Sequence, residues 1–202
     1  QTKKDIINYF NIDEKKIKVI YQSCNEAFIN YSDHGVSENL INNELKRPFL
    51  LYVGNIEDRK NLIFLLKAIK NMKDIVLICV GKKGRYYEKV SKFIFENNLK
   101  NRVIFSNTNN TKVLSAFYRY SRGLVYPSID EGFGIPIIEA MYSKTPVITS
   151  NKAVFKEVAG ENSYYFEEGK LGSLIEKIKE VWSDSKERKE RIEKNLQYVK
   201  KF

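Results

Sequence analysis

Two carboxylates bracket a glycine-containing stretch in the second half of the chain. Glu131 and Glu139 lie eight positions apart, and the residues after the first run Gly132-Phe133-Gly134-Ile135-Pro136. An ionised carboxylate accepts hydrogen bonds through two oxygens, so Glu131 suits sugar hydroxyls and Glu139 suits the hydroxyl pair of a ribose. Glycines let backbone N–H groups approach a ligand, and proline suits the first turn of a helix. The stretch predicts a cradle for an anion or a polyol.

A second group of candidate residues is cationic. Arg59 and Lys60 follow Gly54 and Asn55 and precede a helical pattern. Cations beside a helix amino terminus cost about 0.3 to 1 kcal/mol each unless an anion neutralises them. A diphosphate would remove this conflict.

A third, weaker candidate is the turn at Gly81 and Lys82, which follows the next apolar run. It predicts either a border to a nucleotide base or a simple turn.

The two stronger groups also have purely structural interpretations. Glu139 could complement a helix dipole while Glu131 is solvated, and Arg59 and Lys60 could extend into water or pair with the acidic residues just before them. The residues by themselves leave these alternatives open.

The sequence lacks the usual patterns of several other active sites. It contains no G-x-G-x-x-G, no P-loop and no D-x-D, so dinucleotide, P-loop and carboxylate-held metal sites are not indicated. His34, the only histidine, lies in a polar stretch and is expected to be solvated. Cys24 and Cys79 are too few for a disulfide scaffold and wrongly spaced for zinc, which favours a reducing cytoplasm.

Composition excludes whole classes of protein. With 202 residues, 43% of them apolar and 30% charged, the chain is neither disordered nor fibrous. The longest purely apolar run, Ile75 to Val80, is far too short to span a bilayer. The net charge of +10 permits nucleic acid, anionic lipid or a phosphorylated ligand as partner. Nucleic acid is the least favoured, because the basic residues are mostly dispersed lysines.

These candidates must be positioned by alternating strands and helices, which begin at Pro48. Short β-branched or aromatic runs alternate with helical stripes, which is typical of an α/β fold with a Rossmann-like parallel sheet flanked by helices. The expected strands are 49–53, 75–80, 103–105, 123–126, 147–149 and 164–166. Before them we expect a helix over 3–10, an edge strand over 17–20 and a linker over 32–43. Two helices, over 171–182 and 186–202, are expected to follow.

Four segments resemble the retaining glycosyltransferases of family four, which have the two-domain GT-B fold. They are YVGNIEDRKNLIFLLKAI (52–69), VIFSNTNNTKVLSAFYRYSRGLVYPS (103–128), EGFGIPIIEAM (131–141) and TPVITSNKAVFKEVAGENSYYF (145–166). They occur in the family's order. The E-x7-E pattern with R-K-N upstream is highly specific as a combination.

The resemblance implies roles for individual residues. Lys60 and Arg59 would clamp the donor diphosphate, Glu131 with Gly132 to Ile135 would hold the donor sugar and the distal phosphate, and Glu139 would hold the ribose. Gly54, Asn55, Gly81 and Lys82 would line the nucleotide site. Many members have arginine where this chain has Asn55, and Arg59 is the expected substitute.

The resemblance also implies a domain organisation. Residues 1–46 would be the tail of an amino-terminal domain and a linker, 47–182 the donor-binding domain, and 183–202 a carboxy-terminal helix that returns towards the first domain. Most of that first domain would then lie outside this sequence. The chain alone is therefore expected to bind donor but transfer little.

The expected activity is transfer of a hexose, with mannose favoured, from a nucleotide diphosphate sugar to a saccharide or lipid-linked acceptor, with retention of configuration. No metal or other cofactor is expected. The expected location is the cytoplasm, which allows peripheral contact with the inner membrane face. The alternatives are a nonenzymatic nucleotide-binding module, a GT-B epimerase or phosphorylase, and a basic protein that binds membrane or nucleic acid through residues 186–201.

Overall fold

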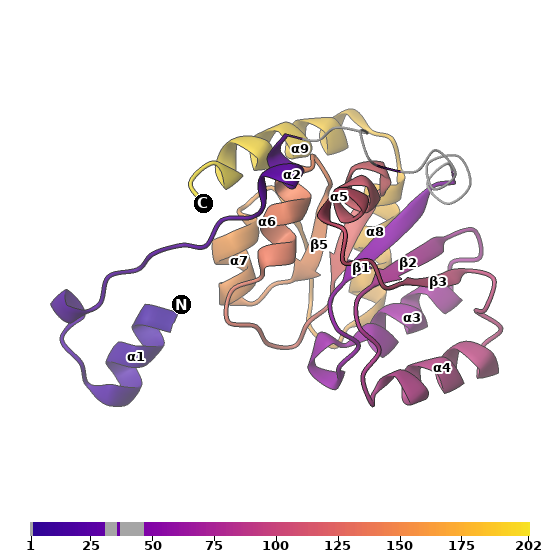
Figure 1. Ribbon diagram of the computed structural model, residues 1–202, viewed down its shortest axis with the longest axis horizontal. Helices are drawn as coiled ribbons and strands as arrows, with labels where there is room; N and C mark the ends of the chain where they lie inside the picture. Colours follow the sequence, from indigo (N-terminus) through magenta and orange to yellow (C-terminus); the bar gives the residue numbers. More distant parts are fainter. Residues whose placement is uncertain (1, 31–35, 37–46) are drawn as a thin grey trace.

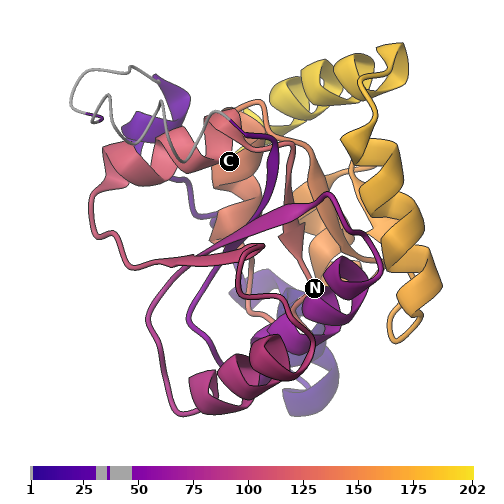
Figure 2. The same ribbon diagram turned by 90° about the vertical axis from the view of Figure 1, so that its right-hand side faces the viewer.

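The computed structural model describes residues 2–30, 36 and 47–202, and its centre is a six-stranded parallel sheet (Figures 1 and 2). The strand order is β3-β2-β1-β4-β5-β6. The strands are β1 (Phe49–Val53), β2 (Val76–Val80), β3 (Val103–Ser106), β4 (Gly123–Tyr126), β5 (Val147–Ser150) and β6 (Tyr164–Phe166). Each lies within one residue of its expected bounds at either end. The α/β class predicted from the sequence is confirmed.

Helices cover both faces of the sheet, because the apolar strands bury both of theirs. Along β1, Phe49 and Leu51 pack into one core, while Leu50 and Tyr52 pack into the other. The first core lies under α5 (Thr111–Tyr120), α6 (Ile135–Tyr142), α7 (Ala153–Ala159) and α9 (Lys186–Val199). The second lies under α3 (Leu62–Lys70), α4 (Tyr87–Glu96) and α8 (Leu171–Trp182).

The amino-terminal segment differs from its prediction in one respect. It contains α1 (Thr2–Phe10), η1 (Glu14–Lys16) and α2 (Glu26–Ile29), and α1 lies to one side of the body of the molecule (Figure 1). The edge strand expected over 17–20 was wrong, because these residues pair with no strand of the described chain. Val19 and Ile20 are instead 49% and 80% exposed. The linker expected over 32–43 lies outside the described residues except for position 36.

The strand order places a switch point at the centre of the sheet. β1 and β4 are neighbours, yet β1 continues into α3 on one face and β4 into α6 on the other. In open parallel sheets, ligands bind outside the strand carboxyl ends at such a point. Gly54 follows β1, and Glu131 lies between β4 and α6.

One close approach at this edge requires glycine. Gly81 follows β2 with a φ of +154°, and a Cβ there would lie 2.1 Å from the carbonyl oxygen of Gly54. The turns after β1 and β2 therefore contact each other directly, as the hydrogen bond from Gly54 N–H to the Val80 carbonyl also shows (2.9 Å).

Candidate functional site

Lys60 and Glu131 form a buried ion pair at the strand carboxyl ends. Lys60 is the last residue of η3 (Asp58–Lys60) and is only 8% exposed. Its Nζ lies 2.5 Å from Glu131 Oε1 and donates a hydrogen bond to the Tyr126 hydroxyl at 3.2 Å. A buried ammonium must be paired, and the partner here is a carboxylate 71 positions away in sequence. The structure thus joins the cationic group to the first of the two carboxylates.

Arg59 completes this cluster from the solvent side. One guanidinium nitrogen lies 2.9 Å from Glu131 Oε2 and another lies 3.2 Å from Glu57 Oε2. The Arg59 side chain is 52% exposed. Pairing with Glu57 was the structural alternative, and it is observed alongside the contact with Glu131. The Arg59 carbonyl also accepts a hydrogen bond from Ile129 N–H at 2.8 Å, which fixes the loop that carries Glu131.

The ion pair sets the charge of the site. Burial raises the pKa of Glu131, but hydrogen bonding to Lys60 and the charge of Lys60, with help from Ser128 and Arg59, outweigh it and hold that pKa below its usual value. Glu131 is therefore ionised at neutral pH. Burial, followed by the negative charge of Glu131, raises the pKa of Tyr126 well above its usual range, so this phenol stays neutral.

Glu139 lies one turn into α6 and has a different environment. It accepts a hydrogen bond from the Tyr118 hydroxyl at 2.7 Å. Burial raises its pKa although the hydrogen bond from Tyr118 opposes this. Glu139 is thus partly buried and paired with a phenol. The structural alternative made Glu131 a solvated residue, but its side chain is only 11% exposed.

The amino terminus of α6 is open. Gly134 precedes the helix with a φ of +114°, no side chain caps the first turn, and Pro136 occupies that turn as the sequence indicated. Ile135 and Gly132 are exposed. Free N–H groups at a helix amino terminus attract anions.

The sequence analysis missed two tyrosines that accompany the charged residues. Tyr126 contacts Lys60, Tyr118 contacts Glu139, and Tyr126 contributes to the raised pKa of Tyr118. Both are almost fully buried. Their positions, at the end of a buried run and on a helical stripe, indicated core residues, and nothing in the pattern distinguished the hydroxyls.

The remaining predicted residues line the turns after β1 and β2. A Cβ at Gly54 would lie 3.6 Å from the Lys60 side chain, so this glycine packs against the buried lysine. The Asn55 carbonyl accepts a hydrogen bond from the Tyr52 hydroxyl (3.3 Å), and the Lys82 carbonyl accepts one from Ile56 N–H (3.0 Å). The side chains of Asn55 and Lys82 are exposed. The predicted border to a nucleotide base stays a prediction.

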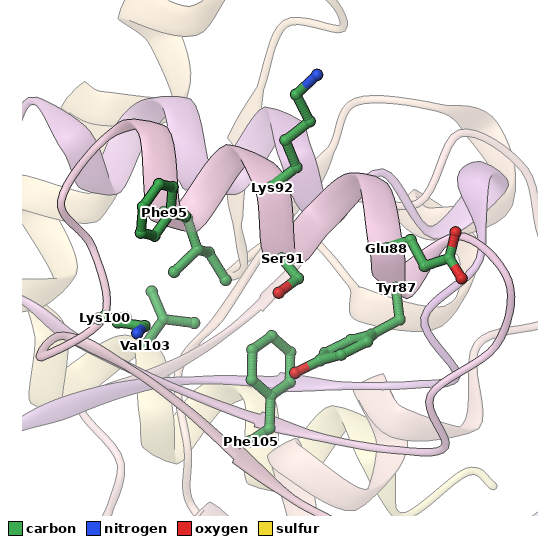
Figure 3. A pocket seen from close by; sticks show the side chains of 9 residues that line it. Tyr87, Glu88, Ser91, Lys92, Phe95, Lys100, Val103 and Phe105 are labelled. Atoms are coloured by element: carbon green, nitrogen blue, oxygen red, sulfur yellow. The ribbon is translucent and has the colours of Figure 1, made fainter.

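A hollow of about 640 Å³ lies elsewhere, between α4 and the edge strand β3 (Figure 3). Tyr87 and Phe105 lie at one end of it, and Phe95 and Val103 at the other. None of the site residues predicted from the sequence lines this hollow.

The described part of the chain offers no candidate metal site. His34 lies outside the described residues. Among the described residues, no group of three or more His, Cys, Asp or Glu side chains lies close enough together to hold a metal ion.

We expect replacement of Arg59 by alanine to have a small effect. Its guanidinium is half exposed, and exposed ion pairs contribute about 0.2 to 1 kcal/mol, so affinity for the nucleotide diphosphate sugar expected from the sequence should fall by no more than about fivefold. Calorimetric titration of the complete protein would measure this. The loss should shrink further in high salt, and a loss above 100-fold would place Arg59 at the centre of the site instead.

The chain is similar to known sugar-transferring proteins. The family model described as glycosyl transferases group 1 matches residues 37–198. The O-antigen chain mannosyltransferase RfbU of Salmonella typhimurium is 36% identical over 164 residues, which are 81% of this chain and 43% of that protein. A glycosyltransferase structure from Rickettsia africae superposes with a TM-score of 0.87 at 22% identity, over 99% of this chain and 56% of the other.

A further structure, HepE of Anabaena in complex with UDP and glucose, has a TM-score of 0.82 at 18% identity and covers 94% of this chain and 53% of its own. This chain spans about half the length of each of these three proteins. Within the described residues, no helix combines the length and the apolar character needed to cross a bilayer.

Three observations indicate the same family. Four sequence segments occur in the family's order, charged residues meet at the strand carboxyl ends, and the family model matches most of the chain. This chain belongs to the group 1 glycosyltransferases.

Proposed function

We propose that this chain is the donor-binding half of a retaining hexosyltransferase. It would bind a nucleotide diphosphate sugar, with mannose favoured because RfbU is a mannosyltransferase, and transfer the hexose to a saccharide or lipid-linked acceptor. The observation that carries the proposal is the buried Lys60–Glu131 pair, with Arg59 beside it, at the switch point of the sheet.

Lys60 has the capacity to bind a phosphate without losing its partners. An ammonium has three N–H donors, of which Glu131 and Tyr126 occupy two. The third is left for an oxygen of the donor diphosphate. Negative charge develops on that diphosphate as the glycosidic bond breaks, and a preorganised cation in a buried site stabilises it strongly. Lys60, helped by Arg59, would thus stabilise the leaving group.

The two carboxylates would divide the rest of the donor between them. Glu131 and the open turn from Gly132 to Ile135 would contact the sugar hydroxyls and the distal phosphate, because that turn offers both acceptors and free N–H donors. Glu139, one turn further along α6, would accept the ribose hydroxyls. The position of both carboxylates between β4 and the second turn of α6 supports one continuous site.

We propose that transfer needs no divalent metal, because Lys60 and Arg59 supply the positive charge that a metal would otherwise bring to the diphosphate. Transfer by the complete protein should therefore keep its rate, within about twofold, after treatment with EDTA and dialysis. Radiolabelled or chromatographic detection of product would measure this. Loss of transfer that Mg²⁺ or Mn²⁺ restores would contradict the metal-free proposal.

Acceptor recognition would belong largely to a further domain. Residues 1–46 would be the tail of that domain and the linker to this one. The amino-terminal segment exposes Tyr9, Phe10 and Ile20 by 83%, 72% and 80%, which supports contact with another part of the protein. A cytoplasmic location, with peripheral contact to the inner membrane face, fits a lipid-linked acceptor.

The alternative of membrane or nucleic-acid binding through residues 186–201 is less favoured. Helix α9 packs on α6 and α7, and Asn195 and Val199 are buried. Two of its cations already have partners: Arg188 donates to two backbone carbonyls, and Arg191 pairs with Glu187. A nucleotide-binding module without activity, or an epimerase or phosphorylase of the same fold, would use the same donor site and must be separated by experiment.

The test is a donor screen on the complete protein. A ligand at 100 times its Kd stabilises a protein by about 2.7 kcal/mol, so a thermal shift with GDP, UDP, ADP and their sugars should identify the base and the sugar. Transfer to an acceptor, with the product anomer determined by NMR, distinguishes a retaining transferase from the alternatives. Absence of binding to every nucleotide and nucleotide sugar by the folded protein would overturn the proposal.

A further inference from the structure

Four aromatic rings from three distant parts of the chain meet beside the glycine turn. We call Tyr21, Phe133, Tyr198 and Phe202 the aromatic cluster. The Phe133 ring stacks on Tyr21 with centroids 5.9 Å apart and meets Phe202 edge to face at 5.7 Å. Phe202 also lies 5.0 Å from Tyr21 and 6.2 Å from Tyr198. Three of the four rings therefore contact one another mutually.

The aromatic cluster is fixed to the body of the molecule through α7. The Tyr21 hydroxyl donates a hydrogen bond to Glu157 Oε1 (3.1 Å), and the Tyr198 hydroxyl donates one to the Glu157 carbonyl (2.9 Å). In addition, the Lys201 ammonium lies 3.7 Å from the centre of the Tyr198 ring. Tyr21 and Tyr198 thus hold the aromatic cluster against a packed helix.

Phe133 is the residue through which this cluster can act on the donor site. It lies between Gly132 and Gly134, which have no side chains to pack, and a Cβ at Gly132 would meet no atom within 4 Å. The preceding loop is fixed at Ile129, whose N–H binds the Arg59 carbonyl, and the following residues enter α6. Within Gly132 to Gly134, only the Phe133 side chain can anchor the backbone.

We propose that Phe202 and Tyr21 are positioning residues of the donor site. They hold the Phe133 ring and thereby fix the turn from Glu131 to Ile135, whose carboxylate and N–H groups face the sugar and the distal phosphate. This inference rests on the proposed function for its substrate but adds residues outside the donor contacts. It also assigns a role to Tyr21, in the segment that leads from η1 to α2, and to Phe202, three residues after the end of α9.

Phe202→Ala in the complete protein tests the inference. The Kd for the nucleotide sugar should rise about tenfold, which is equivalent to about 1.4 kcal/mol and lies near the upper value for one aromatic pair. The Kd for the nucleoside monophosphate, which lacks the distal phosphate and the sugar, should stay within about twofold. Phe202→Tyr should restore the affinity, and Tyr21→Ala should repeat the loss.

Hydrogen exchange supplies a readout that needs no ligand. Deuterium uptake in the peptide covering residues 131–135 should increase in Phe202→Ala and remain unchanged in the control Phe95→Ala. The control removes a 70% exposed ring on α4, outside the aromatic cluster. If Phe202→Ala fails to fold, Phe202→Leu replaces it, since leucine keeps the apolar volume but loses the ring contacts.

Each outcome decides the inference. Unchanged affinity together with unchanged exchange would overturn it, and equal weakening of monophosphate and nucleotide sugar would indicate only a general loss of stability and would also overturn it. If the wild-type protein binds no nucleotide sugar, the proposed function fails, and hydrogen exchange alone then tests the inference. Increased deuterium uptake at residues 131–135 in Phe202→Ala would support positioning of the turn, whereas unchanged uptake would overturn the inference.

Discussion

Replacement of Lys60 by methionine is expected to abolish most donor binding and transfer. Methionine fills a similar volume but leaves Glu131 without its main cation in a buried position. Truncating one partner of a buried, hydrogen-bonded charge pair costs about 2 to 5 kcal/mol, and the donor diphosphate would lose the main cation that we propose binds it. Affinity for nucleotide sugar should therefore fall by roughly 30- to 5,000-fold.

A matched control separates this effect from loss of charge in general. Lys67→Met removes an exposed lysine from α3, close in sequence to Lys60, and should change neither affinity nor melting temperature noticeably. Calorimetry with nucleoside diphosphate and nucleotide sugar measures both variants. Unaltered affinity in Lys60→Met would remove this lysine from the donor site.

A double variant tests whether Lys60 and Glu131 act as a pair. Lys60→Met leaves an unpaired carboxylate, and Glu131→Gln leaves an unpaired ammonium, so each single change should destabilise the protein. In the double variant neither charge remains, and the loss of stability should be smaller than the sum of the two. Strict additivity of the free energies of unfolding would show that the two residues do not interact in solution.

The strands could be predicted because a parallel sheet buries both of its faces. Runs such as Phe49 to Val53 are apolar throughout, and no other element of similar length needs that composition. The same reasoning failed over Ile17 to Ile20. A β-branched run forms a strand only where a partner strand is available, and neither edge of the described sheet lies against this segment.

Pairing across the site could be predicted only in part. The pattern placed Lys60 and Glu131 at one edge of the sheet, since both follow parallel strands. It did not indicate that Glu131, rather than Glu57 or Asp58, neutralises Lys60, because that choice depends on how η3 turns the lysine inward. Tyr118 and Tyr126 were missed for a related reason: a buried tyrosine and a buried phenylalanine give the same apolar pattern.

Glu139→Gln is expected to weaken nucleotide binding while stabilising the fold. A hydrogen bond to a charged group contributes about 1.5 to 3 kcal/mol, so loss of the carboxylate from the proposed ribose site should raise the Kd for nucleoside diphosphate roughly 10- to 150-fold. Wild-type protein should bind the 2′- or 3′-deoxynucleotide more weakly than the nucleotide that carries both ribose hydroxyls. The Glu139→Gln variant should bind these two nucleotides with nearly equal affinity. An equal loss in both proteins would show that Glu139 does not contact the ribose.

The stability change follows from the direction of the pKa shift. Burial raises the pKa of Glu139 in the folded state, so the folded protein binds its proton more tightly than the unfolded chain does. The stabilisation linked to this proton is complete below the unfolded pKa and is lost as the pH rises through the folded pKa. At neutral pH the ionised carboxylate therefore costs stability, and glutamine, which can still accept the Tyr118 hydrogen bond, removes that cost.

The melting temperature of Glu139→Gln should accordingly exceed that of wild type at pH 7, and the difference should narrow as the pH falls towards the ordinary range of carboxyl groups, near 4.3. Glu131→Gln should behave in the opposite way, since Lys60 lowers the pKa of Glu131 and its ionised form stabilises the fold. Two neighbouring carboxylates with opposite effects on stability would then mark the division between them: Glu131 supports the structure of the site, and Glu139 is kept, at a cost in stability, for the ligand.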